Sequence, residues 1–176
     1  MIETERLILR PWTDADREPF AAMCADPEVM RHFPATLNRT ESDAVVERMV
    51  AHQADHGFSF FALERKADGA FLGFTGMMTL KTENPLQPGV EIGWRLAREA
   101  WGAGYASEAA LAAIRHGFDT LGLEQIVSFT ATENLRSQAV MQRIGMTRRA
   151  DLDFDHPAVP EGHRLRPHVV YAIEPR

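Results

Sequence analysis

Residues 99–110 read EAWGAGYASEAA, and this stretch decides the fold. Gly102 and Gly104 stand one residue apart, and a run of small residues typical of a closely packed helix follows them. Glycine inside ordered structure costs about 0.5–1 kcal/mol relative to alanine, because it loses more conformational freedom on folding. A function that needs bare backbone at this point would offset that cost.

Three interpretations of the glycine pair are open on the residues alone. In the first, free N–H groups and the positive end of a helix dipole form a cradle for phosphate. In the second, the pair is a dinucleotide-binding fingerprint, but GAGYAS supplies only G-x-G-x-x-S, and residues 97–101 separate it from the preceding strand. In the third, the pair is a tight turn. A P-loop is excluded, because no Lys-Ser or Lys-Thr follows Gly104.

The segments around the glycines favour the phosphate cradle. Residues 90–96, VEIGWRL, alternate as in a strand, with Val90, Ile92, Trp94 and Leu96 on one face and Glu91, Gly93 and Arg95 on the other. Apolar residues at helical spacing predict a helix over residues 105–121, and residues 124–131 predict another strand. A second helix follows, with Asn134 as its cap and Gly145 at its end.

The rest of the chain predicts a sheet built mostly from hairpins. Strands are expected at residues 6–12, 58–65, 70–80, 146–154 and 166–174. Helices are expected from Thr13 or Asp14 to Cys24, in a short piece within residues 26–34, and from a Thr40 cap to Gly57. This order indicates one mixed α/β, α+β-like domain over residues 1–176.

Composition narrows the class of protein. The chain has 176 residues and a formal net charge of −6, which argues against broad nucleic-acid binding. No apolar run is long enough to span a bilayer, so we expect no membrane partner. Cys24 is the only cysteine, and the first residues lack a secretory pattern. We therefore expect a cytoplasmic protein with Cys24 in its core.

Two central segments carry a family resemblance. VEIGWRLAREAWGAGYASEAALAAIRHGF (residues 90–118) resembles the acetyl-CoA-binding segment of the GNAT superfamily of N-acetyltransferases. ATENLRSQAVMQRIGM (residues 131–146) resembles the next segment in the ribosomal-protein N-acetyltransferase-like (RimJ/RimL-type) branch. TERLILRPW and DPEVMRHFP resemble that branch's opening. Glu99 departs from the family pattern, which has Gln or Arg at this position.

The resemblance implies the GNAT fold, a twisted and mostly antiparallel central sheet flanked by helices, with one parallel strand pair that splays apart. It places acetyl-CoA, as co-substrate, between the strands at residues 90–96 and 125–131, with its pyrophosphate on the amides of residues 101–106. The implied cofactor-binding residues are Ile92, Gly93, Trp94, Trp101, Gly102, Ala103, Gly104, Tyr105, Ala106, Asn134 and Arg143. Arg98 and Arg136 are further phosphate candidates, and each arginine could equally be a solvated surface residue.

The implied chemistry is direct attack of a neutral amine on the thioester. The backbone of residues 92–94 would polarise the carbonyl. Glu91 is the candidate general base, and its alternatives are binding the ammonium group or pairing with Arg95. Ser137 would protonate the departing thiolate, or else be an ordinary helix-surface serine. Asn134 can serve both as a helix cap and as a cofactor contact.

The predicted function is acetyl-CoA-dependent N-acetylation of a primary amine, on a protein N-terminus or a small molecule. The alternative is a non-catalytic sensor that binds acyl-CoA. His156, His163 and His168 lack the spacing of a metal site, so no metal is expected. Tyr171 is either an acid at the acceptor site or strand core. A homodimer is compatible with this interpretation.

Overall fold

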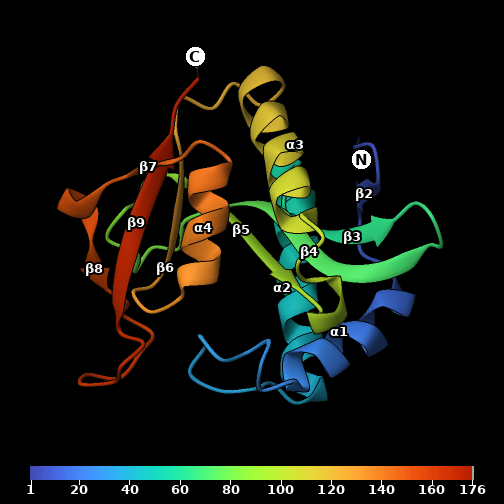
Figure 1. The fold of residues 1–176 in the computed structure, drawn as a ribbon, viewed down its shortest axis with the longest axis horizontal. Helices are drawn as coiled ribbons and strands as arrows, with labels where there is room; N and C mark the ends of the chain where they lie inside the picture. Colours follow the sequence, from blue (N-terminus) through green and yellow to red (C-terminus); the bar gives the residue numbers. More distant parts are fainter. Residues whose placement is uncertain (176) are drawn as a thin grey trace.

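A computed structural model describes residues 1–175, whose strands form one twisted sheet (Figure 1). The strands are β1 (Ile2–Glu3), β2 (Leu7–Arg10), β3 (Phe60–Arg65), β4 (Ala70–Thr79), β5 (Val90–Leu96), β6 (Ile126–Ala131), β7 (Thr147–Arg148), β8 (Phe154–Asp155) and β9 (Pro167–Ile173). Their order is β1-β2-β3-β4-β5-β6-β9-β7, with β8 paired to β9. Only the β5–β6 pair is parallel among these strands, which confirms the predicted fold class.

The helices cover both faces of the sheet (Figure 1). They are α1 (Arg17–Ala25), α2 (Arg39–His56), α3 (Tyr105–Asp119) and α4 (Leu135–Arg143). Helix α3 packs its apolar stripe on Met77 and Ile92, whereas Phe74, on the other face of β4, packs with α1 and α2. None of the helices in residues 1–175 combines the length and apolar character needed to cross a membrane.

Most boundaries predicted from local sequence signals agree closely with the helix and strand boundaries in the structure. Strand β5 has the predicted bounds, and residues 66–69 connect the hairpin of β3 and β4. The N-cap of helix α2 lies two residues before the predicted Thr40 cap. Asn38 is its N-cap: the side chain accepts from the Glu41 amide at 2.9 Å, and the Glu41 carboxylate accepts from the Asn38 amide at 2.8 Å. This reciprocal pair satisfies two free amides, which leaves Thr40 inside the helix.

Two predicted elements are wrong in detail. Residues 26–34 form turns without a helix, because the Asp26 side chain accepts from the Glu28 amide at 2.8 Å and Pro34 stops any extension. Residues 146–154 do not form one strand. They divide into β7, a 3₁₀ turn at Ala150–Leu152 and β8, and the Arg148–Asp153 ion pair at 2.6 Å joins the two ends of the turn.

A charged network fixes the start of α1 against the sheet. Asp16 is 2% exposed, and its carboxylate accepts from the Arg10 guanidinium at 2.7 and 2.8 Å. Arg10 also donates to Glu64 at 2.6 Å, and the Thr13 amide donates to Asp16 at 2.8 Å. Burial works against ionisation of Asp16, but the hydrogen bonds from Arg10 and Thr13 outweigh it and lower the pKa of this carboxyl.

Removing Asp16 should therefore destabilise the protein strongly. We expect Asp16→Ala to reduce the free energy of unfolding by about 3–5 kcal/mol, because it leaves the Arg10 charge with one partner fewer in a buried setting. Asp14→Ala is the matched control, since the Asp14 side chain in the same turn is fully exposed, and we expect it to change stability by less than about 0.5 kcal/mol. Urea unfolding measures both, and equal losses would contradict the assignment.

Candidate active site

Strands β5 and β6 separate part-way along their length. Strand β5 pairs with β4 over its full length, from Val90 to Leu96. Its parallel pairing with β6 is registered only at Glu91 and Val127. Strand β6 meanwhile stays paired with β9 as far as Ala131. The sheet is therefore continuous on each side but opens between these two strands towards their carboxyl ends.

One side-chain bond marks where the strands part. The Ser128 hydroxyl, buried in β6, donates to the Ile92 carbonyl at 3.0 Å. The Leu96 carbonyl on the same side of β5 accepts from the Trp101 indole N–H at 2.9 Å. Because backbone groups alternate along a strand, the N–H and C=O of Trp94, midway between them, face the gap. Ser128 was not among the predicted site residues, although a polar residue within the apolar strand 126–131 was the available signal.

The glycine segment forms a cradle of free amides at the same end of β5. Gly102 and Gly104 adopt φ values of +77° and +81°, which strain any residue with a Cβ. The Trp101 amide donates to the Arg98 carbonyl at 3.1 Å, so the free amides begin at Gly102 rather than at Trp101. Within residues 1–175, the amides of residues 102–107 have no acceptor. These N–H groups at the start of α3 suit an anion.

Arginine side chains lie beside the cradle. Arg143 reaches from the end of α4 and donates to the Ser107 hydroxyl at 3.1 Å. The Arg136 guanidinium lies 4.8 Å from the centre of the Trp101 ring. Arg98 and Glu99 are both exposed on the 3₁₀ turn at Arg98–Ala100. Arg143 and Arg136 are therefore held close to the cradle.

An acidic residue in the first turn of α3 is neutralised by the turn between β1 and β2. Glu108 accepts from the Arg6 guanidinium at 2.7 Å and from the Thr4 hydroxyl at 2.5 Å. Burial tends to raise the pKa of Glu108, but these hydrogen bonds lower it overall. The carboxylate charge is thus matched by Arg6, so the cradle keeps its preference for an anion.

Asn134 caps α4, as predicted. Its Oδ1 accepts from the Ser137 amide at 3.3 Å, and its Nδ2 donates to the Thr130 hydroxyl at 2.9 Å. Thr130, near the end of β6, was not identified from the sequence. Ser137 is half-buried in the first turn of α4. Cofactor contact by Asn134 and proton donation by Ser137 remain predictions.

Glu91 lies on the face of β5 opposite α3. It is half-buried, and within residues 1–175 it forms no ion pair. Burial raises its pKa to about 7, although the charge of Lys81 opposes this rise. The alternative pairing with Arg95 is wrong: Arg95 donates to the Cys24 sulfur at 3.4 Å instead. Cys24 itself is buried, as expected.

Other candidate residues lie apart from this chemistry or line its surroundings. Tyr171 is 3% exposed beneath α4, and its hydroxyl accepts from Gln142 at 3.2 Å, so it is strand core. The His156 and His168 rings lie 4.8 Å apart in an aromatic cluster with Phe129 and Phe154. Burial is the main cause that lowers the pKa of His156 to about 4, so this cluster is uncharged at neutral pH.

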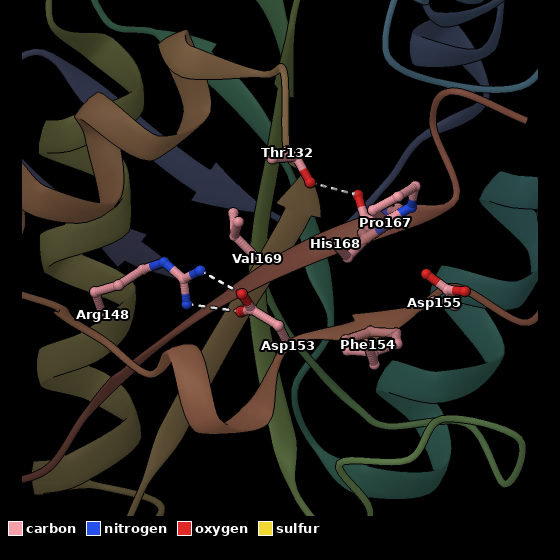
Figure 2. A pocket seen from close by; sticks show the side chains of 8 residues that line it. All are labelled: Thr132, Arg148, Asp153, Phe154, Asp155, Pro167, His168 and Val169. Atoms are coloured by element: carbon pink, nitrogen blue, oxygen red, sulfur yellow. Dashed lines mark hydrogen bonds and ion pairs between the residues drawn. The ribbon is translucent and has the colours of Figure 1, made fainter.

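A separate hollow of about 410 Å³ lies beside β8 and β9 at the edge of the sheet (Figure 2). Two pairs of its polar groups bind one another: Arg148 with Asp153 at 2.6 Å, and the Thr132 hydroxyl with the Pro167 carbonyl at 3.0 Å. Asp155 and His168 are each within hydrogen-bond distance of Arg166. None of the predicted site residues lines this hollow. The free donors lie instead at the opening between β5 and β6.

Comparisons with known proteins agree on one family. A family model described as the acetyltransferase (GNAT) domain matches residues 6–147. The chain is 32% identical to the FsC-acetyl coenzyme A-N(2)-transacetylase of Aspergillus fumigatus, over 92% of this chain and 72% of that protein. It resembles the crystal structure of a GNAT-family acetyltransferase from Bacillus anthracis, with a TM-score of 0.82, 26% identity and coverage of 98% and 97%.

A more distant relative shares the fold alone. The spermidine N-acetyltransferase of Vibrio cholerae, solved with CoA and spermine, is 17% identical to this chain with a TM-score of 0.74. The structural match covers 97% of this chain and 96% of the Vibrio cholerae chain.

The raised pKa of Glu91 predicts a pH-dependent effect on stability. Because the folded-state pKa of about 7 lies above the ordinary value of 4.5, the unfolded chain loses the Glu91 proton first, so stability falls from about pH 4.5 to about pH 7 and levels off above pH 7. We expect Glu91→Gln to gain roughly 2–3 kcal/mol of stability relative to the wild type between pH 4 and pH 8. Urea unfolding at several pH values measures this difference, and a difference that does not change with pH would contradict it.

Proposed function

Since the chain belongs to the GNAT family and is an acyltransferase, we propose that it transfers the acetyl group of acetyl-CoA to a primary amine by direct attack on the thioester. The amine belongs to a small molecule or to the N-terminus of a peptide. We place this activity in the cytoplasm, where a lone free thiol such as Cys24 is ordinary.

The observation that carries the proposal is the free backbone at one end of β5. The amides of residues 102–107 fit a pyrophosphate, and Arg143 and Arg136 supply positive charge beside them. The unpaired C=O of Trp94 fits an amide N–H of an arm that lies along the strand edge. The residues present therefore suit acetyl-CoA, which supplies an acetyl group activated as a thioester.

The residues of the chain have distinct roles in this proposal. Glu91 accepts a proton from the amine, and a pKa of about 7 suits a base that works near neutral pH. The Trp94 N–H, facing the gap, stabilises negative charge on the carbonyl oxygen. The Ser137 hydroxyl donates a proton to the departing thiolate. No covalent enzyme intermediate is required, and Cys24 is buried, with burial raising the pKa of its thiol and keeping it neutral.

Contacts between two loops favour a small acceptor. Arg164, in the loop between β8 and β9, donates to the Arg31 carbonyl at 3.3 Å in the loop between α1 and α2. It also pairs with Glu133, just after β6. These contacts join the two loops to the segment just after β6, and we propose that the joined loops restrict the acceptor to a compact amine.

Altering the cradle should weaken acetyl-CoA binding specifically. A Cβ at Gly104 is strained by about 1–2 kcal/mol at a φ of +81°, so relieving the strain displaces the free amides. We expect Gly104→Ala to weaken acetyl-CoA binding about tenfold in calorimetric titration. Gly122→Ala is the matched control, because Gly122 has a φ of +66° in a turn after α3. Equal effects of the two variants, or no binding by the wild type, would contradict the cradle.

Glu91 should control the pH dependence of turnover. We expect thiol release from acetyl-CoA with a panel of amines, and a wild-type kcat that falls below about pH 7 as Glu91 is protonated. Glu91→Gln should lower kcat by roughly 10²–10⁴-fold and remove this acidic limb, and Ser137→Ala should lower kcat by roughly 10²-fold.

Glu83→Gln serves as the control for Glu91→Gln, since Glu83 is exposed in the β4–β5 loop. An unchanged acidic limb in Glu91→Gln would remove Glu91 from the mechanism. Acetyl-CoA binding without thiol release for any amine would favour the sensor alternative.

A further inference from the structure

Arg95 is a half-buried cation without a counter-ion. It lies on β5, on the same face as Glu91 and two residues beyond Gly93. Its Nη1 donates to the Cys24 sulfur at 3.4 Å, while its Nε is buried and has no hydrogen-bond partner within residues 1–175. No carboxylate of the described residues lies within ion-pair distance of it.

Arg10, another partly buried arginine of this chain, has ion-pair partners. Arg10 is paired with both Asp16 and Glu64 at 2.6–2.7 Å. Cys24 does not replace such a partner for Arg95, because burial raises the pKa of the thiol and keeps it neutral. Since a buried charge without a partner is unfavourable, the arrangement leaves Arg95 suited to an anion brought by a ligand.

Two aromatic rings determine how Arg95 can be approached. The guanidinium lies 4.1 Å from the centre of the Phe33 ring and 5.4 Å from that of Phe74. Contacts with ring faces leave in-plane binding to the N–H groups at the edge of the guanidinium, of which Nη1 already donates to Cys24 and Nε is buried, so an anion would approach through Nη2. A planar carboxylate accepts such in-plane, charge-assisted hydrogen bonds from arginine. Phe33 is 39% exposed, so the site lies close to solvent.

The surroundings of Arg95 also favour an anion. Although the chain carries a net charge of −6, the adjoining loops concentrate positive charge. Burial and the nearby Arg31, Arg164 and Arg136 lower the pKa of His32, the residue next to Phe33. The positive charge of Lys81 likewise contributes to lowering the pKa of His156. Two acids lie beside this group, and both are paired within it: Glu133 with Arg164, and Glu28 with Arg31 at 4.0 Å.

The spacing along β5 fits an amine and a carboxylate in one small molecule. Gly93 and Arg95 are two residues apart on one face, roughly 6–7 Å along the strand. The Phe60 ring lies over Gly93 on this face, so an amine held beside Glu91 places a carboxylate of the same molecule next to Phe60 and within reach of the Arg95 side chain. The uncharged cluster of Phe129, Phe154, His156 and His168 lies on the same face and suits an apolar side chain. Two of its members, Phe154 and His168, also line the hollow beside β8 and β9.

We propose that Arg95 binds the carboxylate of the acceptor, so that the acceptor class is an amino acid or another primary amine that carries a carboxylate. This inference rests on the proposed acetyl transfer and specifies the substrate class of that site. Arg95 would contact the substrate away from the reacting atoms and would determine specificity.

Matched acceptors test the inference directly. L-phenylalanine is compared with phenethylamine, and L-leucine with 3-methylbutylamine, by kcat/KM for thiol release. We expect the wild type to prefer each acid by about 10–100-fold, as charge-assisted hydrogen bonds predict. Arg95→Met should lose this preference but keep its rate with phenethylamine, and Arg95→Lys should keep part of it. Arg115→Met, exposed on α3, is the control.

A binding measurement separates this inference from the proposed function. With CoA present, N-acetyl-L-phenylalanine should bind at least about tenfold more tightly than its methyl ester in calorimetric titration, and Arg95→Met should remove the difference. Turnover without acid preference, or acid preference that persists in Arg95→Met, overturns the role of Arg95 and leaves acetyl transfer standing.

The remaining outcomes are also decisive. If acetyl-CoA binds but no amine releases thiol, the calorimetric arm alone decides the role of Arg95. If neither acetyl-CoA binding nor thiol release is found, the proposed function fails, and this inference fails with it. The melting temperature of Arg95→Met should stay unchanged or rise, because a buried unpaired charge is removed; a fall without loss of acid preference would mark Arg95 as structural.

Discussion

The separation of β5 from β6 is the constraint on which the rest of the structure depends. Each strand keeps a full antiparallel partner on its outer side, and the two meet only around Glu91 and Val127 and through the Ser128–Ile92 hydrogen bond. Backbone polar groups in a central strand are normally paired. The N–H and C=O of Trp94 are exceptions, so the sheet itself provides an edge to which an extended ligand can bind.

The glycine cradle is important for the proposed function because it lies beside this opening. Because α3 starts shortly after β5 ends, its free amides lie at the end of the sheet where the strands diverge. Gly102 and Gly104 supply the left-handed turns that the short connection needs. The turn between β1 and β2 also contributes, since Arg6 and Thr4 bind Glu108 and offset an acidic charge in the first turn of α3.

Two ionisable groups on one face of β5 are arranged in a way that is unfavourable for stability and is expected at a substrate site. Glu91 and Arg95 are both half-buried, and neither has an ion-pair partner within residues 1–175. The Arg10–Asp16–Glu64 network shows that the same chain pairs such charges where only structure is concerned. Unpaired charges are unfavourable in the free protein, which is expected where a site is preorganised for a substrate.

Local chemistry was enough to predict β5, the β3–β4 hairpin, the glycine turns and the Asn134 cap, because periodicity, positive φ and capping involve residues close in sequence. The choice of Asn38 over Thr40, and the division of residues 146–154, depended on which side chains found partners. The sequence by itself determined that a strand, a bare turn and a helix follow one another. Only the tertiary structure decided that Ser128 marks the parting of the strands and that Arg95 lies unpaired between Phe33 and Phe74. These contacts join residues far apart in the chain, and their energies depend on burial that no local pattern records.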